Sequence, residues 1–133
     1  MTRKGFTLIE LMVVILIVGI LAAASIPLMR GRVDSAKWSE ANATAGTIRS
    51  AVRVYFAETG SSAAIIGALD DADIQSALGF NDADLTGTYF VPGDYEITAV
   101  DATGKATIVV TGSTADAPTG SMTLNPDGSW VKN

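Results

Sequence analysis

The sequence predicts an α+β protein in which one long N-terminal helix packs on a small antiparallel β-sheet. Three observations support this fold class. Residues 11–28 carry no charge, residues 38–55 repeat apolar side chains at helical spacing, and the last third alternates short β-prone runs with turn residues. A chain of 133 residues has room for one modest soluble domain beside the apolar segment.

The segment from Leu11 to Leu28 is apolar on every side, which is typical of a helix that spans a membrane. At about 1.5 Å per residue it reaches roughly 27 Å, close to the thickness of the hydrocarbon core of a bilayer. Gly19 lowers helix propensity, and Pro27 removes the backbone hydrogen bond to Ala23. We therefore expect a helix break or kink between Gly19 and Pro27.

The helix is expected to continue to residue 58 with a different surface. Its apolar residues recur at spacings of three and four, which aligns them on one face for packing against the sheet: Trp38, Ala41, Ala45, Ile48, Val52 and Tyr55. Arg49 and Arg53 fall on the opposite face. Gly60 suits the left-handed backbone that commonly ends a helix.

Short elements follow Gly60. Asp70 or Asp71 is expected to cap a short helix that ends near Gly79 and gathers Ile74, Ala77 and Leu78 on one face. Four strand-like runs come next, and the last two flank the strong turn signal NPDG: YEITAV, ATIVVT, SMTL and SWVK. These runs supply the predicted antiparallel sheet.

Composition excludes several functions. The chain has no His and no Cys, so Ser-His and Cys-His nucleophile pairs, imidazole or thiolate metal sites and disulfides are ruled out. Residues 54–133 carry eleven acids against Lys105 and Lys132, which argues against a general nucleic-acid binder. We expect no enzyme activity, no resident cofactor and no nucleic-acid partner.

Glu10 is the unusual residue of the N-terminus, because a carboxylate carried toward the bilayer centre costs on the order of 3 kcal/mol and requires a cationic partner. A secretory signal, with Arg3 and Lys4 as its basic region and a cleavage site within residues 22–24, leaves Glu10 uncompensated. A plain single-pass anchor explains neither Glu10 nor the amphipathic extension of the helix. Both alternatives are therefore less favoured than a third.

The third interpretation starts from the string KGFTLIE, followed by the long apolar run and Pro27. This N-terminus resembles the class III signal of bacterial type IV pilins and of type II secretion pseudopilins. The resemblance implies that a prepilin peptidase cuts between Gly5 and Phe6 and methylates the new amino group of Phe6. It also implies that Glu10 pairs with the terminal amine of a neighbouring copy during assembly, and the amine on Phe6 would supply the missing cation.

On this resemblance the chain divides into a leader (residues 1–5), a transmembrane and filament-core helix (6–29) and a soluble pilin head (30–133). The expected partners are other copies of the chain, the prepilin peptidase and N-methyltransferase, and an inner-membrane assembly platform with its motor. The subunit would be stored in the bacterial inner membrane with its head outside the cytoplasm. It would then enter an extracellular or periplasmic filament.

Three functions remain open for this chain. The leading one is a subunit of a type IV pilus-like filament. The second is the major pseudopilin of a type II secretion system, although the tyrosine and proline that often follow the long helix in that group are missing from AETGSSAA. The third, from another class, is a membrane-anchored periplasmic binding domain that does not polymerise.

Two weaker signals suggest bound or attached groups. NDADLTG places Asp82 and Asp84 at alternating positions, as in the first half of a calcium loop, and Asp101 and Asp116 are further calcium candidates, although acidic turns are usually only solvated. EANAT around Asn42 fits a bacterial N-glycosylation sequon, but it falls within the predicted helix.

Other side chains of the long helix have ordinary explanations. Arg49 and Arg53 could contact DNA, but two bases on an exposed helix face are more often solvated or paired. Trp38, Tyr55 and Phe56 could suggest electron transfer, but packing in the core explains them better.

Overall fold

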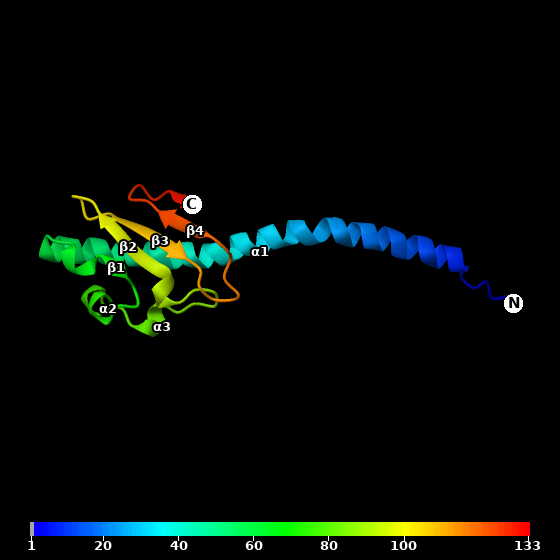
Figure 1. Cartoon of the computed structure of the whole chain (residues 1–133), viewed down its shortest axis with the longest axis horizontal. Helices are drawn as coiled ribbons and strands as arrows, with labels where there is room; N and C mark the ends of the chain where they lie inside the picture. Colours follow the sequence, from blue (N-terminus) through cyan, green and yellow to red (C-terminus); the bar gives the residue numbers. More distant parts are fainter. Residues whose placement is uncertain (1) are drawn as a thin grey trace. The chain divides into compact units, whose positions relative to one another are not determined.

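The computed structural model describes residues 2–133 (Figure 1). In chain order the elements are α1 (Leu8–Thr59), η1 (Ala63–Ile65), β1 (Gly67–Ala68), α2 (Ala72–Leu78), α3 (Asp82–Leu85), η2 (Pro92–Asp94), β2 (Tyr95–Val100), β3 (Ala106–Thr111), β4 (Ser121–Leu124) and β5 (Trp130–Lys132). The long N-terminal helix and the antiparallel strands confirm the predicted α+β class.

The chain divides into two compact units at Ser35/Ala36, with α1 contributing to both. The sequence places the start of the head at residue 30. Residues 30–36 are exposed, and Trp38 is the first buried residue of α1, so contacts with the rest of the head begin there.

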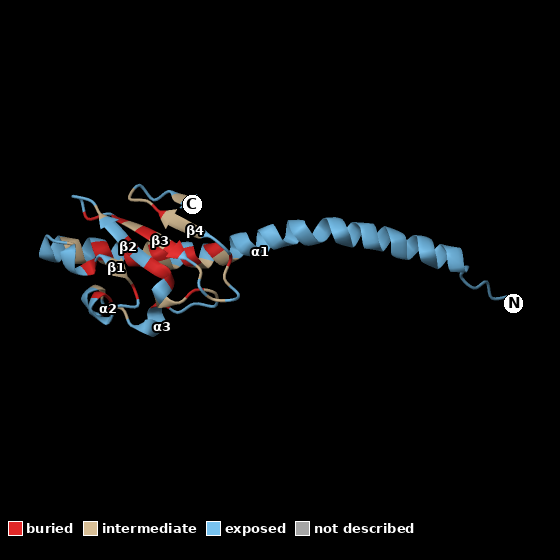
Figure 2. Cartoon of the chain, viewed as in Figure 1, coloured by how far each residue is buried: buried red, intermediate tan, exposed pale blue. Residues whose placement is uncertain are grey.

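The first unit contains residues 8–35 of α1, and its side chains are exposed (Figure 2). The helix break predicted at Gly19 and Pro27 is wrong, because α1 continues through both residues, while a kink at these residues stays a prediction. Pro27 removes the backbone hydrogen bond that its own N–H would have donated, and a proline ring also crowds the carbonyl four residues before it, here that of Ala23. The surrounding hydrogen bonds of a long helix are sufficient to maintain the helical backbone.

The head contains a five-stranded sheet in the order β1-β2-β3-β4-β5, with every neighbouring pair antiparallel. In β3 the side chains alternate, so that Ala106, Ile108 and Val110 are buried while the residues between them are partly exposed. This alternation is expected of a sheet with one face on a core.

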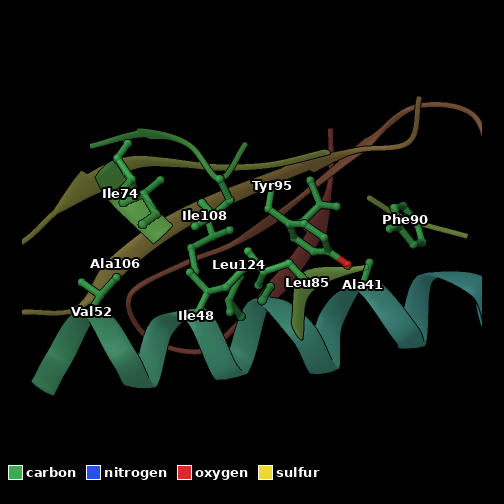
Figure 3. Close-up of a cluster of buried hydrophobic side chains, with 14 of the residues drawn as sticks. Ala41, Ile48, Val52, Ile74, Leu85, Phe90, Tyr95, Ala106, Ile108 and Leu124 are labelled. Atoms are coloured by element: carbon green, nitrogen blue, oxygen red, sulfur yellow. The ribbon is translucent and has the colours of Figure 1, made fainter. Parts of the chain in front are cut away.

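The core of the head lies between this sheet and α1 (Figure 3). The predicted stripe on α1 is confirmed, since Trp38, Ala41, Ala45, Ile48 and Val52 are buried, and Tyr55 packs against them partly exposed. The largest fully buried side chains that complete the core come from the sheet and the connections: Tyr95, Phe90, Ile65, Leu69, Leu85, Ile97, Ile108 and Val110.

The predicted helix ends are confirmed. Gly60 has φ 68° and its N–H donates to the Phe56 carbonyl at 2.8 Å. The carboxylate of Asp71 caps α2 by accepting from the backbone N–H of Asp73 at 2.8 Å, and α2 ends at Gly79 with φ 76°. These are the capping geometries that Asp and Gly favour.

The predicted apolar face of α2 is wrong at one position, because Ala77 is exposed while Ile74 is buried and Leu78 is partly buried. Gln75 occupies the buried position instead. Its amide nitrogen donates to the Leu69 carbonyl at 2.7 Å and to Asp82 Oδ1 at 2.8 Å. A buried amide is tolerated because its donors are satisfied.

The last strands are held without a disulfide. Trp130 of β5 packs edge-on against Trp38 of α1, with ring centroids 6.3 Å apart. Asn133 is tied to β4, because its backbone N–H donates to the Ser121 carbonyl at 3.0 Å and its side chain bonds Ser121 and Thr123. The NPDG turn closes as predicted, with a 2.9 Å hydrogen bond from Gly128 N–H to the Asn125 carbonyl.

Candidate assembly segment

The helix α1 begins with a capping box formed by Thr7 and Glu10. The Thr7 hydroxyl oxygen accepts from the Glu10 backbone N–H at 3.3 Å, and Glu10 Oε2 accepts from the Thr7 backbone N–H at 2.8 Å and from its hydroxyl at 3.0 Å. This reciprocal pattern satisfies donors at a helix start that have no partner within the helix. The carboxylate is therefore fixed beside the first turn.

Thr7 is the residue of this site that the sequence analysis missed. The signal was present, because Thr-x-x-Glu directly before an apolar run is the sequence signature of a capping box. The sequence analysis assigned Glu10 a cationic partner in another copy of the chain and did not consider Thr7. The two roles are compatible, since the bonds to Thr7 use Oε2, one of the two carboxylate oxygens.

Gly5 and Phe6 lie before α1 on an exposed segment that is neither helix nor strand. The Phe6 residue is 87% exposed to solvent. Exposed segments without regular secondary structure are the preferred sites of proteolytic cleavage. Phe6 and Glu10 line one shallow groove on the helix together with Ile9, Val13 and Val14. The structure thus brings the predicted processing site and the predicted assembly carboxylate to the same surface.

The surface that follows is a continuous apolar one. Large side chains from Leu8 to Met29 are exposed, many of them by more than half, including Leu8, Ile9, Leu11, Met12, Ile15, Leu16, Ile20, Leu21, Leu28 and Met29. Exposed apolar area on this scale marks a surface that binds lipid or protein. The helix is long and apolar enough to cross a membrane.

The two calcium candidates Asp82 and Asp84 take part in the short helix α3, which the sequence analysis did not predict. Asn81 caps α3, and Asp84 returns a capping-box bond by accepting from the Asn81 N–H at 3.0 Å. Asp82 accepts from Gln75 as described above. Both carboxylates therefore have a structural role, and calcium binding stays an untested prediction.

Asp101 and Asp116 lie in two different turns. Asp101 Oδ1 accepts from the Thr103 hydroxyl at 2.7 Å and from the Lys105 N–H at 3.0 Å, and these bonds lower the pKa of the Asp101 carboxyl. The Asp116 backbone carbonyl accepts from Lys37 Nζ at 2.6 Å, and the same ammonium lies 4.9 Å from the centre of the Tyr89 ring. Among residues 2–133 the structure shows no group of three or more acidic side chains placed to hold a metal ion.

The remaining candidates lie along α1. Arg53 is exposed, as predicted, and Asn42 is exposed within α1. Arg49 is partly buried, and its guanidinium lies close to the NPDG turn, where a Cβ on Gly128 would be 3.2 Å from Nη1. The placement of Arg49 wholly on the exposed face is therefore wrong, because the β4–β5 turn folds over it. Trp38 packs on Phe90 at 5.3 Å, as expected of core aromatics.

The long exposed apolar helix and the small antiparallel sheet agree with the α+β fold of pilins. Comparison with known proteins is more specific. Residues 1–26 match the family model of the prokaryotic N-terminal methylation motif.

The chain is also similar to three curated pilus proteins. It is 48% identical over 58 residues to the fimbrial protein EcpC of Eikenella corrodens, covering 44% of this chain and 38% of that protein. It is 46% identical over 54 residues to the type IV narrow pilus major component PilA5 of Thermus thermophilus, covering 41% and 47%. It is 50% identical over 58 residues to the type IV major pilin protein PilE1 of Neisseria gonorrhoeae, covering 44% and 35%.

These matches confirm the predicted resemblance to type IV pilins. The matched region spans less than half of the length of each of these relatives, and the family model covers residues 1–26, which contain KGFTLIE and most of the apolar run. The family model therefore describes the N-terminal segment of the chain and does not extend to the head.

Proposed function

We propose that this chain is a structural subunit of a type IV pilus-like filament, assembled through its N-terminal helix. The observation that carries the proposal is the combination of KGFTLIE with an exposed apolar helix whose only charge between Thr7 and Met29 is Glu10. The family model over residues 1–26 and the similarity to pilins support it.

Processing would occur between Gly5 and Phe6 by a prepilin peptidase that also methylates the new amine. The cut removes Arg3 and Lys4 and creates a cation on Phe6, which is four residues before Glu10 and lines the same groove. An ion pair in an apolar filament core contributes little net stability, but a misaligned copy would leave a charge unpaired. Glu10 would therefore set the register of docking.

Assembly would exchange lipid contact for contact between helices. Without a hydrophobic driving force between helices in lipid, association depends on close packing, which small residues permit. Gly19 has no atom within 4 Å of where its Cβ would lie, and residues 22–25 are Ala or Ser. This part of α1 can therefore accept a close neighbour.

The subunit itself would catalyse no reaction. Its partners would be other copies of the chain, the peptidase, and an inner-membrane assembly platform with its motor. It would be stored in the inner membrane with the head outside the cytoplasm and then move into the filament. We assign no cofactor to it.

The proposal is tested by Glu10→Val in the source bacterium. We expect the variant to be inserted and cut normally, and filaments sheared from the cells to fall at least tenfold. Glu58→Val is the matched control, because Glu58 is an exposed acid at the other end of the same helix. Normal filament yield from Glu10→Val would contradict the docking role.

The alternatives give different results in the same assay. A type II secretion pseudopilin would give no long surface fibres, and deletion of the gene would block export of secreted proteins. A periplasmic binding domain that does not polymerise would stay in the membrane fraction. Long sheared fibres rich in this chain would support the pilus assignment.

A further inference from the structure

Two arginines follow directly after the apolar segment of α1. Residues 11–29 carry no charge, and Arg30 and Arg32 are the first charged side chains beyond them. Both are exposed and lie in the same compact unit as the apolar segment. Nineteen helical residues reach roughly 28 Å, so a helix that spans a bilayer at this segment places both arginines at the phosphate level of the far leaflet.

The two arginines point in different directions around the helix. At about 100° per residue they are separated by about 200° around the axis and by only about 3 Å along it. A single protein surface on one side of the helix can contact one of them but not both. A layer of lipid headgroups surrounds the helix on all sides at one depth, and it can therefore bind both.

The charged residues next to Arg30 and Arg32 in the sequence are not expected to bind the same phosphates. Lys37 is the next cation, but its ammonium donates to the Asp116 carbonyl and lies over the Tyr89 ring, so it is already used within the head. Asp34 lies one turn after Arg30, about 6 Å farther from the apolar segment. At that distance it is on the aqueous side of the phosphates.

We propose that Arg30 and Arg32 form a phosphate-binding collar for phospholipid headgroups in the leaflet that faces the head. The proposal rests on the proposed function, because it requires that this helix be stored in a membrane. A guanidinium presents a fork of N–H donors that matches the oxygens of a phosphate. Each arginine near an anionic lipid surface is expected to strengthen the association roughly fivefold.

The collar would hold the subunit at a defined depth before assembly. The leader bases Arg3 and Lys4 fix the other end, and their removal with the leader leaves Arg30 and Arg32 as the basic residues that flank the apolar segment. Extraction into a filament must then release the headgroups from both arginines. The collar is therefore a place where lipid composition controls the ease of assembly.

The test uses the processed chain, which lacks the leader bases Arg3 and Lys4, purified from membranes and reconstituted in bilayers of phosphatidylcholine with trace spin-labelled phosphatidylglycerol or spin-labelled phosphatidylcholine. The relative association of the two labelled lipids with the protein is measured. We expect the unchanged chain to prefer phosphatidylglycerol about tenfold or more. The double variant Arg30→Gln, Arg32→Gln should reduce this preference to less than twofold.

Two controls separate the collar from general charge effects. Arg53→Gln removes an exposed arginine of the same helix within the head, and it should leave the preference unchanged. The double variant Arg30→Lys, Arg32→Lys keeps both charges and should retain most of the preference. Excess inorganic phosphate in the aqueous phase should not displace the labelled lipid.

Three results would overturn the collar: an undiminished preference in the double glutamine variant, an equal loss in Arg53→Gln, or displacement of the lipid by inorganic phosphate. The last would assign the site to a soluble anion. A chain that inserts but shows no lipid preference contradicts the collar alone. A chain that does not enter the bilayer at all contradicts the proposed storage in the membrane as well.

Discussion

The two halves of α1 share one helical backbone but place their apolar side chains in opposite environments. In residues 8–35 the large apolar residues are exposed, while in the second half Trp38, Ile48 and Val52 are buried under the sheet (Figure 2). The second half has its partner within the chain. The first half has none there among the described residues, which is why we assign its partner to lipid and to other copies.

The difference shows that the pattern of apolar residues, and not their number, determines which surface the chain covers itself. One small sheet cannot cover a helix that is apolar on every side. It can cover a helix whose apolar residues are spaced by three and four, because that spacing places them on one side. The second half therefore carries the stability of the head, and we assign assembly to the first half. Each of the following predictions tests this division.

The largest effect is expected from Ile48→Ala, compared with Ile15→Ala. Ile48 is fully buried, so its truncation should lower the free energy of unfolding of the head by about 2–5 kcal/mol. Ile15 is 67% exposed, and its truncation should leave that free energy unchanged. The fluorescence of Trp38 and Trp130, both in the head, reports the unfolding in a denaturant titration. Equal losses in both variants would contradict the division.

The second effect concerns the buried hydroxyl of Tyr95. Burial raises the pKa of Tyr95 from 10.0 to about 12, and a contact with the Thr44 side chain offsets this only in part. Because the folded pKa is the higher one, the group stabilises the fold below pH 10 and loses that contribution as the pH rises from 10 to 12. The loss should be about 2–3 kcal/mol.

Tyr95→Phe is the matched variant for this measurement. The Tyr95 hydroxyl has no well-aligned hydrogen-bond partner within residues 2–133, so its removal should change stability little at pH 7. Between pH 10 and 12 the variant should lose less stability than the unchanged chain. Parallel alkaline unfolding curves for the two proteins would show that Tyr95 is not the group responsible.

A third pair of variants compares two glycines of the head. Gly104 has φ 77°, and an added Cβ would lie 2.8 Å from Phe56 Cδ1, so Gly104→Ala should destabilise the head by about 1–3 kcal/mol. Gly46 lies within α1 with no atom within 4 Å of its Cβ position, so Gly46→Ala should stabilise the helix by up to about 1 kcal/mol. Thermal unfolding measures both, and effects of the same sign would contradict this assignment.

The smallest effect is expected at the surface turn of Asp101. Its bonds to Thr103 and Lys105 lower the pKa of Asp101 from the usual 3.8. Because the folded pKa is the lower one, the contribution is present above pH 3.8 and is lost as the pH falls through the folded value. The midpoint of unfolding should therefore fall less between pH 6 and pH 2 in Asp101→Asn. An identical acid dependence would contradict the role of this turn.

Local signals in the sequence were sufficient for much of the fold. The helix stripe, the Asp71 cap, the Gly60 and Gly79 ends and the NPDG turn each depend on residues close together in the chain, and the structure has them where they were predicted. The Thr7–Glu10 capping box was equally local. Its signature was overlooked because the charge of Glu10 suggested a distant partner.

The features that could not be predicted depend on contacts between distant residues. The two-residue strand β1 exists only because Gly67 and Ala68 pair with Ile97 and Glu96 of β2. Glu40 of α1 accepts from the Tyr89 N–H at 3.0 Å, which fixes a loop 49 residues away. The spacing of apolar residues along the sequence does not predict such contacts.

A second long-range contact joins two connections of the head. Asp94 is 3% exposed, and its carboxylate accepts from the Val91 and Ser113 backbone N–H groups at 3.0 Å each. The sequence analysis counted Asp94 only as one of many acids in an acidic half. Its burial became visible once the fold brought Ser113 beside it, because a buried carboxylate requires donors that cover its oxygens.

The central claim is that residues 6–35, which include the first half of α1, are freed from the leader in order to polymerise. The most direct measurement is the intact mass of this chain in filaments sheared from the source bacterium. The account predicts a chain that has lost Met1 to Gly5 and gained one methyl group. A filament built from chains that keep these five residues, or from chains that begin at Ser25, would contradict it.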